Sequence, residues 1–274
     1  MESCLMNYFI INTELKDTCE CNPQLFDEAP SIYEVVRIEK GIPLFLEDHI
    51  KRFYSSATLL KEKIPVKENQ IFSRVKALID ANQIQSGLIK FIYLNHPVAG
   101  SLFATWVTPF FFPSVETYEK GVSLVSLEGN RINPNAKVSH QSVRAQADEL
   151  IRSQKVYEVM LVNDGIITEG SRSNLFFVEH GILFTPHHGL VLEGITRGKI
   201  IDLALDSGID IFESEYTTNE MAGFEAAFLT GTTPKVLPVN KIDQFTFRIY
   251  HPVTMHLSNE YEKLIGRYVE AFSW

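Results

Sequence analysis

Cysteine is scarce in this sequence, and the three residues present, Cys4, Cys19 and Cys21, all lie near the N-terminus. An odd number with one close C-x-C pair supplies neither a disulfide framework nor a full set of metal ligands. The histidines within 187–188 and 251–256 also lack Cys, Asp or Glu partners at ligand spacing. We therefore expect free thiols in a reducing compartment and no bound metal.

A basic excess is also missing, because the 274 residues hold 25 Lys and Arg against 34 Asp and Glu, a formal net charge of −9. General binding to nucleic acid or to an anionic membrane is therefore not expected. No apolar run approaches the roughly 18 residues that a membrane span needs. The apolar start of the chain has no basic residues before it and is broken by Asn7 and Asn12, which indicates a strand rather than a signal peptide. We expect a cytoplasmic protein.

The first half of the chain alternates between strand-like and helix-like patterns. Apolar residues at Ile50, Phe53 and Ala57 have helical spacing, and Glu47 and Asp48 suit a first helical turn. The pattern predicts strands over 8–12, 32–38, 42–46, 88–95 and 101–107, and helices over 47–63 and 69–81.

The segment 108–121 is the best linker candidate, because it holds two prolines and a glycine and loses periodicity. Beyond it, the pattern predicts strands over 122–127, 158–162, 166–170, 174–178, 181–184, 226–231 and 235–239, and helices over 139–153, 195–206 and from Pro252 onward. This alternation predicts an α/β (α+β) fold with a small N-terminal lobe, residues 1–115, and a larger C-terminal lobe, residues 116–274.

Two ionisable residues of the second half stand out. Lys137 lies in an irregular polar segment before a helix; such a lysine is usually solvated, but in a pocket it can lose its proton and form a Schiff base. Glu169 lies in T-E-G-S-R-S-N (168–174). It is either an ordinary charge at a strand end or a carboxylate that keeps a heteroaromatic nitrogen protonated.

Three further segments suit an anion. L-E-G-I-T-R (192–197) opens a helix, so it is either a plain N-cap or a phosphate site at free backbone N–H groups. T-G-T-T (230–233) follows a buried strand and either wraps a phosphate or makes a turn. Arg52 lies beside an apolar helix face, as a surface charge or as a guanidinium directed at the same phosphate.

Taken in order, these segments resemble the class IV, fold-type IV, pyridoxal-phosphate enzymes. The resemblance covers most of the chain and rests on YEVVRIEKGIPLFLEDHIKR, the lysine segment, ITEGSRSNLFF, LEGITR and FLTGTTPKVLPV. The group includes D-amino-acid and branched-chain aminotransferases and aminodeoxychorismate lyase. It implies a two-lobed fold, a pyridoxal 5′-phosphate cofactor, a small-molecule substrate and a homodimer.

The resemblance also implies residue roles. Lys137, in the larger lobe, would hold the cofactor as a Schiff base and move a proton between Cα and C4′, and Glu169 would pair with the pyridinium nitrogen. Tyr33 would face cofactor and substrate. The remaining cofactor-binding positions would be Arg52, Ser171, Ser173, Ile195, Thr196, Gly231, Thr232 and Thr233, of which the serines would lie close to the ring and the others would bind the phosphate.

Departures from the family pattern bear on the substrate. The segment NHPVAGSLF (95–103) has no arginine where D-amino-acid aminotransferases carry an arginine–x–histidine pair, so a D-amino-acid preference is not expected. The segment after the lysine offers His140 and Arg144 in place of the tyrosine of branched-chain enzymes. Each is a candidate substrate contact, or else belongs to a helix start and an exposed face.

The leading hypothesis is a pyridoxal-phosphate-dependent aminotransferase that moves an amino group between a small amino acid and a 2-oxo acid. The alternative is 4-amino-4-deoxychorismate lyase, which releases pyruvate and leaves p-aminobenzoate. A catalytically silent relative that binds the cofactor is a third hypothesis. A hydrolase is excluded by the lack of G-x-S-x-G and H-E-x-x-H motifs.

Overall fold

The computed structural model describes residues 3–129, 131, 133–139 and 142–274, which fold into two units. The first unit consists of residues 3–111, 136–139 and 265–274, and the second of the remaining described residues. This division differs from the expected boundary at residue 115, because the chain returns to the first unit at Lys137 and again at its end. Lys137 therefore belongs to the N-terminal unit and not to the larger unit in which the sequence placed it.

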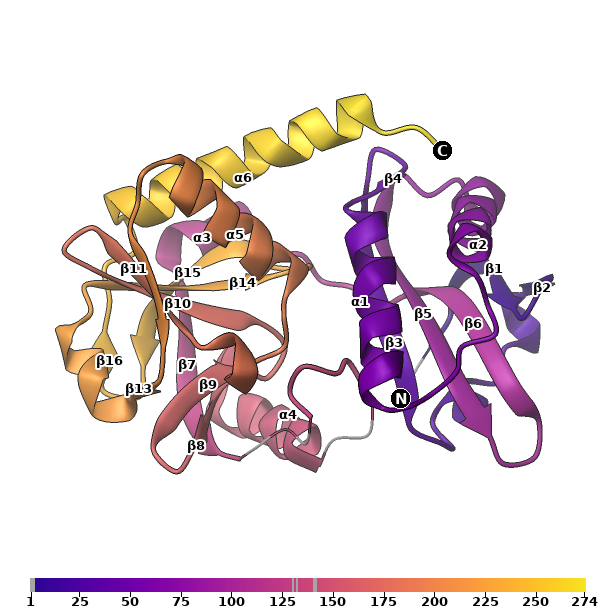
Figure 1. The fold of residues 1–274 in the computed structure, drawn as a ribbon, viewed down its shortest axis with the longest axis horizontal. Helices are drawn as coiled ribbons and strands as arrows, with labels where there is room; N and C mark the ends of the chain where they lie inside the picture. Colours follow the sequence, from indigo (N-terminus) through magenta and orange to yellow (C-terminus); the bar gives the residue numbers. More distant parts are fainter. Residues whose placement is uncertain (1–2, 130, 132, 140–141) are drawn as a thin grey trace. The chain divides into compact units, whose positions relative to one another are not determined.

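A six-stranded sheet forms the centre of the first unit (Figure 1), in the order β2-β1-β6-β5-β3-β4. Its neighbouring strands are antiparallel. The strands are β1 (Leu5–Ile11), β2 (Glu14–Asp17), β3 (Ser31–Glu39), β4 (Ile42–Pro43), β5 (Ser86–His96) and β6 (Gly100–Thr108), and the helices are α1 (Leu46–Leu59) and α2 (Glu68–Asn82), with 3-10 turns at Thr18–Glu20 and Pro23–Phe26.

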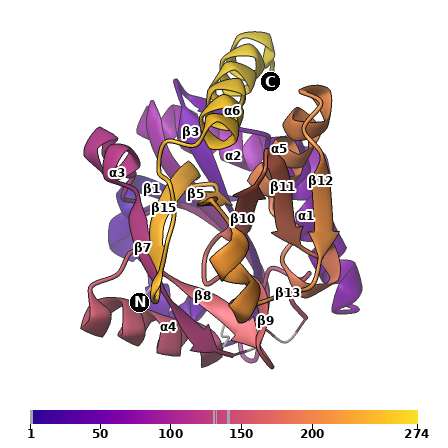
Figure 2. The same ribbon diagram turned by 90° about the vertical axis from the view of Figure 1, so that its left-hand side faces the viewer.

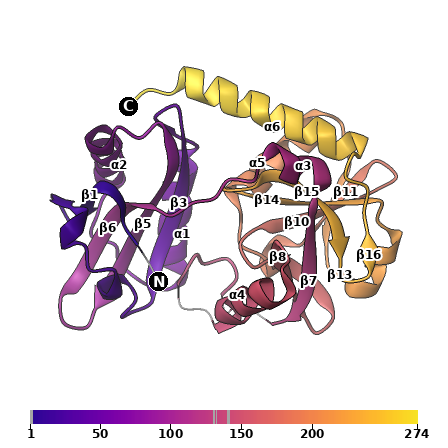
Figure 3. The ribbon, with the colours of Figure 1, turned by 180° about the vertical axis from the view of Figure 1, so that it is seen from behind.

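Both helices lie on the same side of this sheet (Figure 1, Figure 3). Successive side chains of a strand point to opposite faces, so Ile32, Val36 and Ile38 of β3 share one face, where they pack with Ile50 and Phe53 of α1. The opposite face has a separate apolar cluster of Phe9, Phe26, Ile92, Leu94, Leu102, Ala104 and Trp106. The alternation of the sequence therefore fixes both faces of the sheet.

Two local expectations in this unit were wrong. The strand expected over 42–46 ends at Pro43, because Phe45 adopts a left-handed backbone (φ 52°) that ends the extended chain, and α1 begins at Leu46. Cys4 and Cys21, expected as free thiols, form a disulfide, since the fold brings their Cα atoms to 6.8 Å; Cys19 is a free, exposed thiol.

The second unit contains the larger sheet, in the order β12-β11-β10-β14-β15-β7-β8-β9-β13, with β16 paired to β15 (Figure 2). Its strands are β7 (Val122–Glu128), β8 (Glu158–Asn163), β9 (Ile166–Gly170), β10 (Asn174–Glu179), β11 (Ile182–Pro186), β12 (Ile211–Ser214), β13 (Tyr216–Thr217), β14 (Ala226–Gly231), β15 (Lys235–Ile242) and β16 (Phe245–Thr246). The helices are α3 (Val115–Lys120), α4 (Ser142–Gln154), α5 (Ile195–Asp206) and α6 (Pro252–Ala271), and 3-10 turns occupy His188–Leu190 and Thr218–Gly223. The last turns of α6 belong to the first unit.

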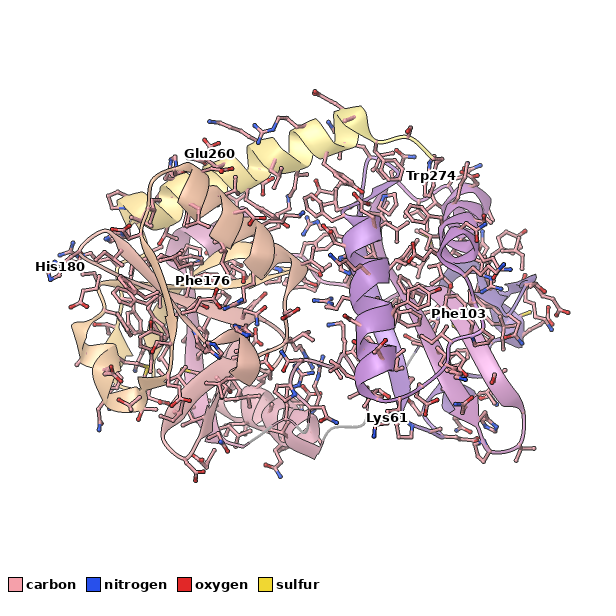
Figure 4. All side chains as sticks on the ribbon, viewed as in Figure 1. Lys61, Phe103, Phe176, His180, Glu260 and Trp274 are labelled. Carbon is pink, nitrogen blue, oxygen red and sulfur yellow. A yellow bond between two sulfur atoms is a disulfide. The ribbon has the colours of Figure 1, made fainter. Side chains whose placement is uncertain are left out.

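Apolar side chains from both ends of this unit's sequence form its core. Leu124, Leu175 and Leu237 belong to one cluster, and Ala147 of α4 packs with Val159 of β8 in another. Figure 4 shows Phe176, which is fully buried and stacks on Phe228 at 5.1 Å between ring centroids. The short strands β12, β13 and β16 were not predicted from the sequence. Helix α3 was not predicted either; it lies inside the expected linker and is capped at its N-terminus by Ser114. Within the described residues, no helix is long and apolar enough to cross a membrane.

Candidate active site

The segment that carries Lys137 pairs with the beginning of β3. Tyr33 N donates to the Lys137 carbonyl at 3.1 Å, Ser139 N donates to the Ser31 carbonyl at 2.9 Å, and Ile32 and Val138 form an antiparallel bridge. Cross-strand neighbours share a face, so this register places Lys137 opposite Tyr33. The Lys137 Nζ lies 5.0 Å from the centroid of the Tyr33 ring. Backbone pairing therefore fixes the lysine beside the tyrosine that the sequence analysis assigned to the same site.

Helix α1 presents a polar row toward β3 at positions 49, 52 and 56. These positions are three and four residues apart, so they follow one another along one helix face. Ser56 Oγ accepts a hydrogen bond from Lys137 N at 3.1 Å, which ties the lysine segment to the helix. Arg52 donates from Nε and Nη2 to the two carboxylate oxygens of Glu34 at 2.8 and 2.7 Å, and the Nδ1 of His49 lies 2.8 Å from the second oxygen. A two-pronged pair of this kind fixes the direction of the guanidinium.

Burial and charge act in opposite directions on this group. Burial alone would raise the pKa of Glu34, but the charge of Arg52 and the hydrogen bonds from Arg52 and His49 outweigh it and lower the pKa to about 2. Burial lowers the pKa of His49, and Arg52 and Lys137 add to this, against the opposing effect of Glu34. Because an ionised carboxylate only accepts, His49 donates its Nδ1 hydrogen to Glu34. Within this group, Glu34 and Arg52 form a buried ion pair.

Glu169 is a buried carboxylate at the end of β9, in the second unit. Arg131 donates to its Oε1 at 2.7 Å, and Leu192 N donates to its Oε2 at 3.0 Å. The Asn174 amide lies 3.4 Å from Oε2 and also donates to the Leu192 carbonyl at 2.9 Å. Glu169 is therefore held in one orientation, with its negative charge matched by an arginine.

The turn that follows Glu169 encloses a second buried carboxylate, Glu158 of β8. Ser171 and Ser173 donate their hydroxyls to it at 3.4 and 3.0 Å, and Arg172 N also donates to it. Burial raises the pKa of Glu158, against the lowering effect of these hydrogen bonds. The structure therefore directs both serine hydroxyls to Glu158. Arg144 lies 3.5 Å from the Ser171 carbonyl and contacts the same turn.

The N-terminus of α5 has the features of an anion site. Gly194 at the N-cap makes no side-chain cap hydrogen bond, and no acidic residue lies in the first turn, so backbone N–H groups and the helix dipole favour a negative charge there. A Cβ on Gly194 would lie 2.0 Å from Asn174 Oδ1, which explains the glycine. The buried Thr196 hydroxyl lies 3.3 Å from the Tyr261 hydroxyl.

The T-G-T-T motif forms the hairpin turn between β14 and β15, in which Gly231 pairs with Lys235. Thr232 and Thr233 lie at the turn and are half-buried. Helix α5 also packs on β14. The structure thus groups Tyr33, Arg52 and Lys137 within the first unit, and it places Glu169, the serine turn, Ile195, Thr196 and residues 231–233 within the second. His140 lies outside the described residues.

Several residues of these groups were not predicted from the sequence. Glu34 had a signal, because a glutamate stands among Ile32, Val36 and Ile38 on the face that the alternation predicts to be apolar. His49 and Ser56 stand at helical spacing from Arg52 and could have been found in the same way. Lys90 had the same signal as Glu34, because it stands within the apolar run LIKFIYL. The other missed residues are Arg131, Glu158 and Asn174, whose contacts with Glu169, the serine turn and Leu192 are formed by the fold.

Comparison with known proteins shows the family of the chain. Residues 31–242 match the family model described as amino-transferase class IV. The chain is 29% identical over 250 residues to a D-alanine aminotransferase of Bacillus licheniformis, covering 85% of this chain and 88% of the relative, and 28% identical over 252 residues to a probable branched-chain-amino-acid aminotransferase of Rickettsia conorii, covering 86% of each.

The fold is also similar to that of solved aminotransferase structures. The T.th. branched-chain amino acid aminotransferase with pyridoxamine 5′-phosphate has a TM-score of 0.85 and 25% identity, covering 97% of this chain and 96% of that one. The structure of a putative 4-amino-4-deoxychorismate lyase from Legionella pneumophila has a TM-score of 0.78 at 21% identity and covers 88% of this chain and 92% of that one, which shows a shared fold alone. The chain belongs to the class IV aminotransferase family. It is a pyridoxal-phosphate-dependent enzyme of the aminotransferase type, as the sequence predicted.

The residues present fit this cofactor. Lys137, in the first unit, would supply an amine for its carbonyl group. Within the second unit, Glu169 would supply a buried carboxylate for its ring nitrogen, and the start of α5, which has no side-chain cap, would supply backbone donors for its phosphate.

Proposed function

We propose that this enzyme transfers an amino group between a small amino acid and a 2-oxo acid, with Lys137 as the residue that carries the cofactor. The observation that supports this assignment most directly is the pairing of the Lys137 segment with β3, which holds the lysine beside Tyr33. Bound pyridoxal phosphate supplies a carbonyl that accepts the amino group and a ring that withdraws electrons from Cα.

The residues of the chain have distinct roles in this proposal. Lys137 acts as the base that would move the proton between the substrate Cα and C4′ of the cofactor. Glu169, oriented by Arg131 and Asn174, keeps the ring nitrogen protonated. Arg52, fixed by Glu34, is assigned to the phosphate. The start of α5 at Ile195 and Thr196 is assigned to the phosphate as well. Gly231, Thr232 and Thr233 complete the phosphate site.

Two of the expected substrate contacts are retained in this proposal. Tyr33 faces the substrate from β3. Arg144 acts through the turn of residues 171–173 that it contacts in the structure. A homodimer and a cytoplasmic location, both expected from the sequence, are part of the same proposal; light scattering of the purified protein and fractionation of cells test them.

Borohydride reduction tests the attachment site. Reduction of the loaded protein, followed by peptide mass spectrometry, is expected to place the pyridoxyl group on the peptide that contains Lys137. Lys137→Ala is expected to lose both this label and transamination of a panel of small amino acids with 2-oxo acids. Lys155→Ala, at an exposed lysine, is the matched control and is expected to behave as the wild type. A label on another lysine, or release of p-aminobenzoate from 4-amino-4-deoxychorismate without transamination, contradicts the proposal.

A further inference from the structure

The second unit buries a carboxylate to which the proposed function gives no role. Glu158 is the first residue of β8 and is 4% exposed. A carboxyl group in a protein interior is unfavourable unless new hydrogen bonds replace those that it makes with water. Three groups of the turn of residues 171–173, which joins β9 to β10, donate such hydrogen bonds to Glu158. The carboxyl group is therefore a fixed point around which this turn is arranged.

Both oxygens of Glu158 hold the turn. Ser171 Oγ donates to Oε1 at 3.4 Å, Arg172 N donates to the same oxygen, and Ser173 Oγ donates to Oε2 at 3.0 Å. Ser171 N also donates to the Val159 carbonyl at 2.9 Å, which ties the backbone of the turn to β8. Three successive residues are thus bound to two neighbouring residues of one strand.

A glycine lets the turn approach the carboxyl group closely. Gly170 is the last residue of β9 and lies opposite Met160 on the neighbouring strand β8 (Figure 2). A Cβ at Gly170 would lie 2.3 Å from Ser173 Oγ and 2.8 Å from Glu158 Oε1. Glycine is the residue that permits such a close approach of the backbone. The turn therefore packs directly on Glu158.

The two ends of this turn carry the residues that orient Glu169. Glu169 precedes Gly170 at the end of β9, and Asn174 follows Ser173 at the start of β10. The Asn174 amide lies 3.4 Å from Glu169 Oε2 and donates to the Leu192 carbonyl at 2.9 Å. Leu192 N donates to the same oxygen of Glu169 at 3.0 Å. A change in the conformation of the turn would therefore move Asn174 relative to the Glu169 carboxylate.

We propose that Glu158 is a positioning residue for Glu169, because it holds the turn of residues 171–173 that sets Asn174 against the Glu169 carboxylate. The inference rests on the proposed function, in which Glu169 keeps the ring nitrogen of the cofactor protonated. The direction of the carboxylate matters there, because a hydrogen bond weakens steeply as its angle leaves the linear arrangement. In this role Glu158 acts through the turn and touches neither cofactor nor substrate.

Two substitutions separate the hydrogen bonds of Glu158 from its charge. Glu158→Gln removes the charge but keeps an oxygen for Arg172 N, and its amide can donate to the Ser173 hydroxyl, which accepts as well as donates. Glu158→Leu fills a similar volume and offers no acceptor to the turn. The proposal therefore predicts that glutamine preserves the position of Glu169 and that leucine does not.

Nitrogen-15 NMR of protein loaded with cofactor labelled at the ring nitrogen tests this role, because protonated and unprotonated ring nitrogens resonate at different positions. Glu158→Leu is expected to reduce the protonated signal. It is also expected to lower kcat by roughly 10- to 100-fold with little change in KM, as a small displacement of a catalytic group predicts. Glu158→Gln is expected to recover most of both. An unchanged signal in Glu158→Leu overturns the inference, and an equal loss in the two variants assigns the effect to charge and overturns it as well.

A carboxylate of the same unit provides the matched control. Glu220 accepts hydrogen bonds from the backbone N and the hydroxyl of Thr217, each at 2.7 Å, in a different turn. Glu220→Leu is expected to change neither the NMR signal nor kcat. If Glu158→Leu folds poorly, Ser173→Ala provides the test, since it removes the 3.0 Å hydrogen bond and keeps the carboxyl group. It is expected to reduce the protonated signal to a smaller extent, and no change overturns the inference.

Glu169→Gln distinguishes this inference from the proposed function. It is expected to lose the protonated signal of the ring nitrogen. If Glu169→Gln keeps that signal, the proposed role of Glu169 is wrong. If Glu169→Gln loses the signal while Glu158→Leu keeps it, only the positioning role of Glu158 is overturned.

Discussion

The carboxylate of Glu34 binds Arg52 through both of its oxygens, at 2.8 and 2.7 Å, in the interior of the first unit. Glu34 is fully buried, and Arg52 is 9% exposed. Such a pair contributes little net stability, because its attraction offsets the cost of removing two charges from water. Its consequence is geometric, since the guanidinium keeps one direction whether or not a phosphate is bound.

Removal of one member of this pair leaves a buried charge. Glu34→Gln is expected to lower the free energy of unfolding by about 3 to 5 kcal/mol, because Arg52 loses its counter-charge, and to weaken pyridoxal-phosphate affinity by misdirecting Arg52. Denaturant titration and equilibrium dialysis measure the two effects. Glu116→Gln, which breaks the exposed pair with Lys120, is the control and is expected to change neither quantity.

The same carboxylate predicts a stability loss in acid. The pKa of Glu34 is lowered from 4.5 to about 2, so its folded form binds fewer protons than its unfolded form between these values. Its contribution to the free energy of unfolding is therefore fully present above pH 4.5 and is lost as the pH falls toward 2. Urea titrations at several pH values between 2 and 4.5 give the free energy of unfolding as a function of pH. This free energy is expected to change less steeply with pH in Glu34→Gln than in the wild type, and an equal pH dependence contradicts the lowered pKa of Glu34.

Glu158 predicts the opposite dependence. Burial raises the pKa of this carboxyl, so the folded state binds more protons than the unfolded state above the ordinary value of 4.5. The contribution of Glu158 is greatest below pH 4.5 and is lost as the pH rises through its folded pKa. Glu158→Gln keeps an acceptor for the serine turn and removes the titration. As the pH rises above 4.5, the midpoint of thermal unfolding of Glu158→Gln is expected to increase relative to that of the wild type, because only the wild type loses the contribution of Glu158.

Two glycines of one region provide a matched test of the anion site. In Gly194→Ala the new Cβ would lie 2.0 Å from Asn174 Oδ1, so Asn174 must move away from Glu169 and Leu192. Both stability and cofactor affinity are expected to fall. In Gly198→Ala no atom lies within 4 Å of the new Cβ, and alanine in a helix is expected to add about 0.5 to 1 kcal/mol to the free energy of unfolding. Equal behaviour of the two variants contradicts the close packing at Gly194.

The main elements followed from local pattern. Helix α5 was predicted at its observed bounds, and β3, β5 and β6 within about two residues. The strand expected over 42–46 was wrong because the backbone conformation of one residue ends it at Pro43. Phe45 adopts a positive φ that ends an extended segment, and no periodicity signals it.

Pairings between distant segments could not be predicted. Cys4 and Cys21 are one example, because the fold brings them together into a disulfide while their spacing indicated free thiols. The hydroxyls of Ser171 and Ser173 are another, since they donate to the buried Glu158 of β8, more than ten residues earlier in the chain.

The sequence by itself determined the main strands and helices, because strand alternation and helical spacing are properties of neighbouring residues. The family, the cofactor and the candidate residues followed from the resemblance of its short motifs, in their order, to class IV enzymes. Only the tertiary structure decided that Lys137 belongs to the first unit, that Glu34 orients Arg52, and that Lys90 lies with Lys137 about one tyrosine ring. The physical reason is the register of β3, which pairs with β5 on one side and with the Lys137 segment on the other. Register depends on contacts between segments far apart in the chain, and no local pattern encodes it.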